Sequence, residues 1–115
     1  MIQRGDVVMV EFPYTDAARS KVRPAVVVLN DRDNQRLRKT VVAMITGNLR
    51  RWGDPNHLFI DPAAEPSSGL SYPSLVSCNN LLMAEQADIR QTIGHLSAAL
   101  KQQLNDCLKA ALELP

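Results

Sequence analysis

Short apolar runs separated by polar turns organise the first two thirds of the chain. Residues 6–12 are rich in β-branched side chains and stop at Pro13, which predicts a strand that ends in a loop. Residues 22–29 are almost continuously apolar, as in a buried strand, and Pro24 belongs near the start of pairing or on an edge because it cannot donate to a ladder. Further strands are predicted over residues 40–46, 58–60 and 75–83.

The last part of the chain holds one long helical pattern. Ser97 is a suitable N-cap, and leucines recur every four positions from Leu100 to Leu112. This spacing predicts an amphipathic helix that packs its apolar stripe on a sheet. The charged connection over residues 30–39 has room for one helical turn. Five or more short strands followed by one helix predict a mainly β (α+β) fold, a small and strongly bent antiparallel barrel with the helix appended.

Size and composition indicate one domain spanning residues 1–115. The chain has 115 residues and a hydrophobic content of 45%, which is enough to fill one core. It has no apolar run of the roughly 18 residues that cross a membrane and starts directly with the strand pattern, so we expect a cytoplasmic protein without a membrane segment. Two cysteines offer neither a disulfide framework nor a zinc site, and we expect no metal and no cofactor.

Charge is distributed unevenly along the chain. The formal net charge is +1, yet nine basic residues lie between Arg19 and Arg51 against only Asp31 and Asp33, so this segment carries +7 and the remainder −6. A domain polarised in this way attracts a polyanion to one face. We therefore expect contact with RNA or DNA, the alternative being a solvated face of loop lysines and arginines.

Sequence motifs for nucleophilic or nucleotide-binding chemistry are missing, but two residues stand at predicted strand boundaries. Arg23 and Thr46 occupy positions where a rigid sheet presents a side chain at its rim. A guanidinium matches a phosphate with two parallel hydrogen bonds, although a structural ion pair would also explain Arg23. His57 flanks the basic loop and His95 precedes the helix, and each also fits a surface or structural role.

Six short segments in a fixed order resemble a known family over nearly the whole chain. They are RGDVV at residues 4–8, FPYTD at 12–16, KVRPAVVV at 21–28, VVAMIT at 41–46, SLVSCN at 74–79 and IGHLS at 93–97. In this order and spacing they resemble the MazF/PemK family of bacterial toxins. The resemblance implies an SH3-like antiparallel β-barrel with a long C-terminal helix that acts as a homodimer and is silenced by a cognate antitoxin.

The resemblance also implies a function. Such toxins, from type II toxin–antitoxin systems, are sequence-specific, ribosome-independent endoribonucleases that cleave single-stranded mRNA. The family's catalytic Arg and Thr match Arg23 and Thr46, and a serine near the same site matches Ser74. RNA supplies its own nucleophile, the 2'-hydroxyl, so the protein has to align it, stabilise charge on the phosphorane and move two protons, without a metal. The general base is open between His57 and a bound water.

Candidate RNA contacts lie on the loops around Arg23 and Thr46. The candidates are Lys21, Arg50 and Arg51 for phosphates, Tyr14 and Trp52 for stacking on unpaired bases, Asn48 and Asn79 for base edges, and His57 and Ser74 beside the reacting groups. Structural roles compete with two of these assignments, because Trp52 can pin its loop to the barrel and Asn48 can cap the turn after Gly47.

Two other functions fit the same sequence pattern. One is a non-catalytic toxin on the same fold, like the CcdB gyrase poisons, which bind a protein target and need neither Arg23 nor a basic loop. The other is an RNA-binding barrel without turnover, which would apply if Thr46 faced inward. The polarised charge favours the endoribonuclease over the gyrase poison.

Overall fold

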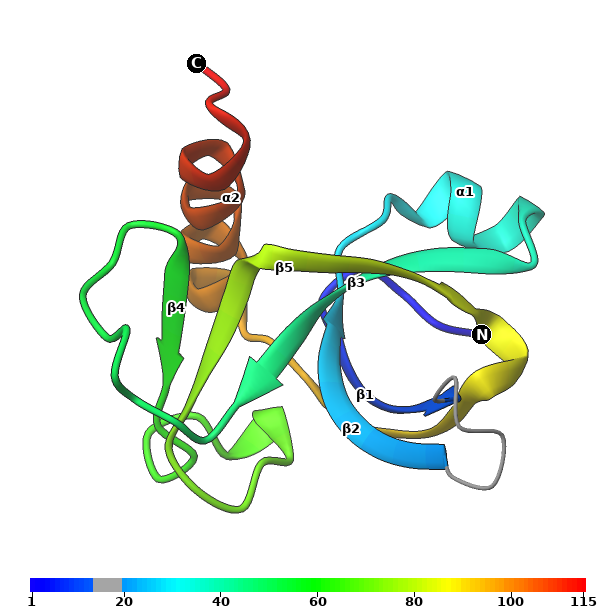
Figure 1. Cartoon of the computed structure of the whole chain (residues 1–115), viewed down its shortest axis with the longest axis horizontal. Helices are drawn as coiled ribbons and strands as arrows, with labels where there is room; N and C mark the ends of the chain where they lie inside the picture. Colours follow the sequence, from blue (N-terminus) through cyan, green and yellow to red (C-terminus); the bar gives the residue numbers. More distant parts are fainter. Residues whose placement is uncertain (14–19) are drawn as a thin grey trace.

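Six antiparallel strands form one strongly curved sheet with a long helix on one side in this computed structural model (Figure 1). The structure describes residues 1–13 and 20–115. The strands are β1 (Asp6–Pro13), β2 (Ser20–Val27), β3 (Lys39–Thr46), β4 (His57–Ile60), β5 (Ser74–Glu85) and β6 (Ile89–His95), in the order β4-β5-β3-β2-β1-β6. The helices are α1 (Asp31–Arg36) and α2 (Ala98–Leu112), and short 3-10 turns lie at Pro66–Ser68 and Gln86–Asp88.

The predicted mainly β fold with a C-terminal helix is confirmed. All five predicted strands are present, and Ser97 caps α2 by accepting the backbone N–H of Leu100. The strand β6 was missed, because it is an edge strand that pairs only with β1 and has no fully buried side chain. Since β4 and β6 remain two separate edges of the sheet, the barrel is a half-barrel.

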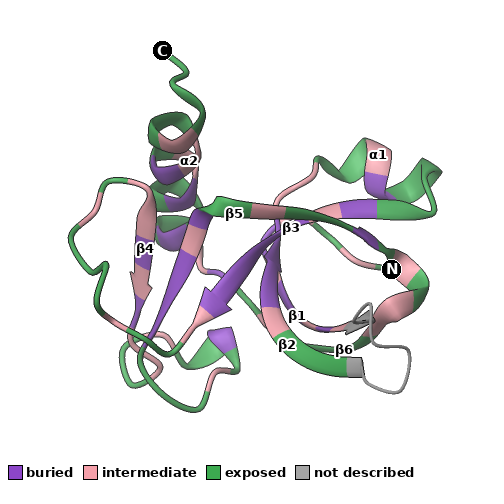
Figure 2. Cartoon of the chain, in the orientation of Figure 1, coloured by how far each residue is buried: buried purple, intermediate pink, exposed green. Residues whose placement is uncertain are grey.

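Alternation along the strands divides the core into two clusters on opposite faces of the sheet. Most of the buried positions lie on the strands and on α2 (Figure 2). On one face Val26, Ala43 and Val76 pack with Leu100 and Leu104 of α2. The other cluster consists of the buried side chains Val8, Val10, Ala25, Val27, Val42, Met44 and Ala84. Successive residues of a strand therefore pack into different clusters. The face on which a side chain lies follows from its position along the strand.

The pairing of β2 with β3 is shorter than either strand. It runs from Val27 opposite Val42 to Ala25 opposite Met44, and it stops there. Pro24 lies just before the first pair, as the sequence predicts, while its other side lies beside Met9 of β1. The ends of β2 and β3 beyond this ladder hold Arg23 and Thr46.

Leu104 of α2 carries much of the packing between the helix and the sheet. It is fully buried in the cluster that α2 forms with the sheet, whereas Leu112 on the last turn of the same helix is 52% exposed. We expect Leu104→Ala to lower the free energy of unfolding by about 2–5 kcal/mol, because it leaves a cavity in a close-packed core. The matched control Leu112→Ala is expected to change it by less than about 0.5 kcal/mol. Urea unfolding of both variants measures the difference, and equal losses would contradict this packing.

The two thiols give the core a pH dependence. Burial raises the pKa of the Cys78 thiol to about 12, and the neighbouring Cys107 adds to the shift. An unfolded chain releases this proton near pH ~8.5, so the thiol's contribution to folding is complete below that pH and declines as the pH rises, by up to about 1.4 kcal/mol per pH unit.

We therefore expect the unfolding free energy of the parent protein to fall more steeply than that of Cys78→Ala between about pH 8 and about pH 10.5. Chemical denaturation at several pH values measures both slopes. Burial is the main cause that raises the pKa of Cys107, and it acts in both proteins, so the additional slope of the parent reports on Cys78. Identical slopes would show that Cys78 does not hold its proton in the folded state.

Candidate functional site

Two adjoining cavities lie at the end of the sheet where β2 and β3 separate. The larger, of about 460 Å³, is lined by Arg23, Met44, Ile45, Thr46, Ser77, Asn80 and Leu82. The smaller, of about 190 Å³, is lined by Thr46, Asn48, Arg50, Arg51, His57 and Ser77. Thr46 and Ser77 belong to both, so the cavities form one continuous depression, which we call the trough.

Strand register explains why these side chains meet. Ser77 of β5 pairs with Met44 of β3 on one side and with His57 of β4 on the other. Paired residues of adjacent strands point to the same face of a sheet, and residues two apart along a strand do so as well. Thr46 and His57 therefore share the face of Ser77, opposite to α2.

Arg23 reaches the trough from the neighbouring strand. Continuing the β2–β3 register two residues past Ala25 and Met44 aligns Arg23 with Thr46. The strands do not pair there, and both side chains line the larger cavity. The sequence predicts each of them at a strand boundary, and in the structure both lie near strand ends and line the larger cavity of the trough.

The Thr46 hydroxyl is fixed by the turn that follows it. Its Oγ1 accepts the backbone N–H of Asn48 at 3.1 Å, and Asn48 Oδ1 accepts the backbone N–H of Arg50 at 3.0 Å. A hydroxyl that accepts one hydrogen bond still has its own hydrogen to donate. Thr46 can therefore donate to a bound oxygen, while the Asn48 carbonyl has the capping role that the sequence offered as an alternative.

Three exposed arginines line the trough, and Lys21 lies two residues from Arg23 on β2. Within the described residues, Lys21, Arg23, Arg50 and Arg51 form no ion pair. Since an unpaired guanidinium at a rim is free to bind an anion, the trough is suited to a phosphate backbone.

The remaining charge of the basic segment is elsewhere. Arg36 pairs with Asp33 at 3.1 Å and Lys39 with Glu85 at 3.7 Å, around α1 and the start of β3. That is the opposite end of β3 from Thr46 (Figure 1). The segment identified by its charge therefore supplies two separate surfaces.

Trp52 combines the two roles proposed for it from the sequence. Its ring stacks on Phe59 of β4, with centroids 4.1 Å apart and planes 14° from parallel, which holds the loop after β3 against the sheet. The side chain is nevertheless 60% exposed. It borders a groove of about 350 Å³ between this loop, β4 and α2, which His57 also lines.

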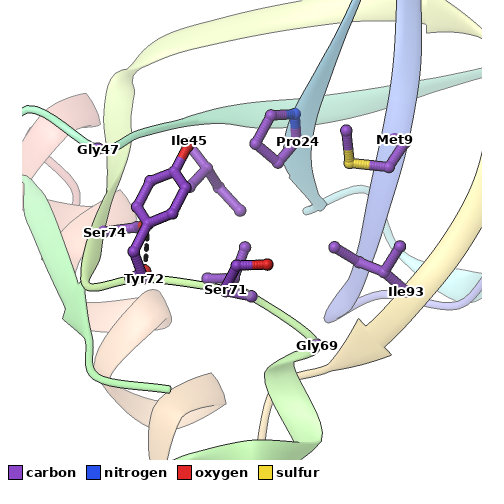
Figure 3. A pocket seen from close by; sticks show the side chains of 10 residues that line it. Met9, Pro24, Ile45, Gly47, Gly69, Ser71, Tyr72, Ser74 and Ile93 are labelled. Carbon is purple, nitrogen blue, oxygen red and sulfur yellow. Dashed lines mark hydrogen bonds between the residues drawn. The ribbon is translucent and has the colours of Figure 1, made fainter. Parts of the chain in front are cut away.

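Ser74 is not brought into the trough. It is 2% exposed, and its Oγ donates to the Tyr72 carbonyl at 2.9 Å. It lines a separate, mostly apolar cavity of about 140 Å³ with Pro24, Ile45 and Tyr72 (Figure 3). Pro24 and Ile45 are the strand neighbours of Arg23 and Thr46, so this cavity lies on the other side of the same two strand ends.

Sequence reasoning missed two polar residues that line the trough, Ser77 and Asn80. Ser77 is a polar residue between the buried Val76 and Cys78, and that interruption of an apolar strand was the available signal. Asn79 is exposed but does not line either cavity of the trough. Tyr14 lies outside the described residues.

Metal ligands are not gathered at this site. Among the described residues, no group of three or more His, Cys, Asp or Glu side chains is placed to hold a metal ion. In the same part of the chain, no helix is long and apolar enough to cross a membrane.

The fold is that of bacterial toxins whose structures have been solved. An endoribonuclease in complex with its cognate antitoxin from a mycobacterial species superposes with a TM-score of 0.82 at 22% identity, covering 100% of this chain and 98% of that one. The Mycobacterium tuberculosis toxin MazF-mt6 gives a TM-score of 0.78 at 24% identity, covering 96% of this chain and 98% of that one. A MazE–MazF structure from Deinococcus radiodurans gives 0.79 at 16% identity, covering 99% and 98%.

Sequence comparison defines the family. Residues 3–112 match the model of the PemK-like, MazF-like toxins of type II toxin–antitoxin systems, and the chain belongs to this family. It is also 24% identical over 115 residues to the endoribonuclease MazF of Staphylococcus saprophyticus, covering 99% of this chain and 93% of that protein. The family resemblance expected from the sequence is confirmed.

Proposed function

We propose that this toxin is a sequence-specific, ribosome-independent endoribonuclease that cleaves single-stranded mRNA by attack of the 2'-hydroxyl, without a metal. One observation carries the proposal: Arg23 and Thr46 line the same cavity, and the unpaired Arg50 and Arg51 line the adjoining one. The names of relatives support it, since the proteins similar to this chain include endoribonucleases.

The residues of the trough suit that reaction. A scissile phosphate placed between Arg23 and Thr46 would receive charge from the guanidinium and a hydrogen bond from the Thr46 hydroxyl, both of which strengthen as negative charge builds on the phosphorane. The 2'-oxygen attacks phosphorus and the 5'-oxygen leaves, giving a 2',3'-cyclic phosphate and a 5'-hydroxyl. Arg50, Arg51 and Lys21 would hold flanking phosphates and set the strand in place.

Partners follow from the same surface. We propose a homodimer, because Leu82, which lines the larger cavity, is 39% exposed, and the apolar Val22 and Met83 on the same two strands as Arg23 and Leu82 are 44% and 67% exposed, so a second copy would cover apolar surface here. We also propose a cognate antitoxin, whose acidic segments would suit the exposed arginines. Two solved relatives were crystallised with an antitoxin or with MazE.

Two other functions compete with this proposal. One is inhibition of gyrase by a CcdB-like toxin, and the other is RNA binding without turnover. A gyrase poison has no use for three exposed arginines that line one trough, and an RNA binder without turnover has no use for a hydroxyl in the same cavity as an arginine. Purified protein that leaves RNA intact but inhibits gyrase would establish the first, and RNA that is bound but uncut would establish the second.

Removal of the Arg23 guanidinium is the direct test of catalysis. We expect the parent protein to cut long single-stranded RNA in the presence of EDTA and to leave cyclic-phosphate ends. Arg23→Ala is expected to cut at least about 100-fold more slowly, the usual cost of losing one transition-state donor. Gel mapping of the RNA ends and single-turnover rates measure both effects.

Arg32→Ala is the matched control for Arg23→Ala. Arg32 is an exposed arginine of α1, at the far end of β3 from the trough. Its removal lowers the net charge equally, so we expect its cleavage rate to stay near that of the parent. An equal loss in the two variants would mean that only total charge matters and would count against a catalytic Arg23.

Trp52 reports directly on RNA binding because it is the single tryptophan of the chain. We expect a short single-stranded RNA with 2'-deoxy sugars, which cannot be cut, to change its fluorescence by stacking on the exposed ring. Trp52→Ala is expected to weaken binding by about 1–3 kcal/mol, the usual value for one stacked base. Fluorescence titration of the parent and polarisation of labelled RNA for the variant measure the two effects. Unchanged emission on saturation would leave Trp52 with its loop-pinning role alone.

A further inference from the structure

We propose that His57 is the general base of this site, taking the proton of the attacking 2'-hydroxyl on its Nε2 atom. The inference rests on the proposed endoribonuclease function and adds to it the group that Arg23 and Thr46 cannot supply. An arginine stays protonated at neutral pH and a threonine hydroxyl is a weak base, so neither takes a proton readily. His57 is the histidine that lines the trough.

Hydrogen bonding selects the tautomer that a base needs. His57 Nδ1 lies 2.8 Å from Asn56 Oδ1 and 4.0 Å from Asp54 Oδ2. An amide oxygen only accepts hydrogen bonds, so the contact with Asn56 places the ring proton on Nδ1, and the Asp54 carboxylate lies behind the same nitrogen. The lone pair of the neutral ring is then on Nε2, and the nearby carboxylate stabilises the imidazolium that forms when Nε2 takes a proton.

The free nitrogen is reached from a cavity. The His57 side chain is only 6% exposed. Within the described part of the chain, Nε2 has no hydrogen-bond partner. Every side-chain nitrogen or oxygen that is fully buried there does have a partner, so Nε2 is not fully buried. Nε2 therefore keeps contact with solvent, and His57 lines both the smaller cavity of the trough and the groove beside Trp52.

The sheet places His57 and Arg23 on opposite sides of Thr46. From β2 to β4 the trough side chains follow one another as Arg23, Thr46, Ser77 and His57, on strands that lie about 4.8 Å apart. Attack on phosphorus needs the entering and leaving oxygens on opposite sides, so a base and a cation that flank the hydroxyl of Thr46 suit it. RNA would cross the strands, with its 2'-oxygen toward β4 and its 5'-oxygen toward β2.

Other charged groups around the ring fit this role. Asp54 stands behind Nδ1, Asp106 of α2 lines the groove on the far side, and Arg50 and Arg51 line the smaller cavity. A phosphate bound by the two arginines would neutralise their charge and leave the carboxylates as the charged groups facing the ring.

The proposed step balances in protons and bonds. The 2'-hydroxyl gives its proton to His57 Nε2 as its oxygen forms a bond to phosphorus. The bond from phosphorus to the 5'-oxygen breaks, and the 5'-oxygen takes a proton from water. Loss of the Nε2 proton to solvent returns the neutral ring, with the cyclic phosphate and the 5'-hydroxyl as products.

The test is a rate–pH profile under single-turnover conditions, on an RNA oligonucleotide that contains a mapped cut. We expect the parent rate to rise with pH as imidazole loses its proton and then to level off. His57→Gln is expected to cut about 100-fold or more slowly, because positioned bases contribute that much, and to lose the rise. Added imidazole is expected to restore part of the rate of His57→Ala. His95→Gln, which removes the exposed histidine at the end of β6, is the matched control and should behave as the parent.

Binding separates a base from a mere contact. We expect His57→Gln to bind the uncleavable 2'-deoxy RNA within about threefold of the parent and to keep its melting temperature, since its loss is in the chemical step. If the parent cuts RNA and His57→Gln cuts it at the same rate with the same rate–pH profile, His57 is not the base, and the proposed function still stands. A loss of binding that matches the loss of rate would also overturn it. A parent that never cuts RNA would overturn the proposed function itself.

Discussion

The whole site depends on strand alternation within one curved sheet. Because successive residues point to opposite faces, Val26, Ala43 and Val76 pack toward α2 while Thr46 and Ser77 face the trough. The hydrophobic packing that holds α2 in place therefore also fixes the direction of the reactive side chains. A slip of one residue in register would move Thr46 into the core and empty the trough of its hydroxyl.

Local pattern was sufficient for most of the fold. Apolar runs located five strands, the leucine spacing located α2, and Ser97 located its start. The exception, β6, is an edge strand that depends on main-chain pairing with β1, so its side chains carry no buried face to detect. Pairing between distant segments is a property of the folded sheet and leaves little trace in local sequence.

Residue type alone was enough to propose some candidates for the site. Which polar residues of a strand face the trough depends on strand register, and the sequence did not show that. Arg23 and Thr46 stood out because a cation and a hydroxyl at strand boundaries suit a phosphate. Ser74 and Ser77 are equally polar residues of one strand, and only the pairing of β5 with β3 and β4 shows that Ser77 faces the trough and Ser74 the opposite side. The count of charges along the sequence could not show where the basic residues lie in space, because in the fold they lie at the two opposite ends of β3.

Pro24 gives the trough a property that no side-chain contact supplies. The ladder between β2 and β3 ends beside it, and proline has no N–H with which to extend a ladder. At Pro24 the backbone therefore cannot donate the hydrogen bond that would continue the pairing toward Arg23 and Thr46. The separation of the two strand ends follows from the residue type at this position and does not require a bound molecule to hold the strands apart.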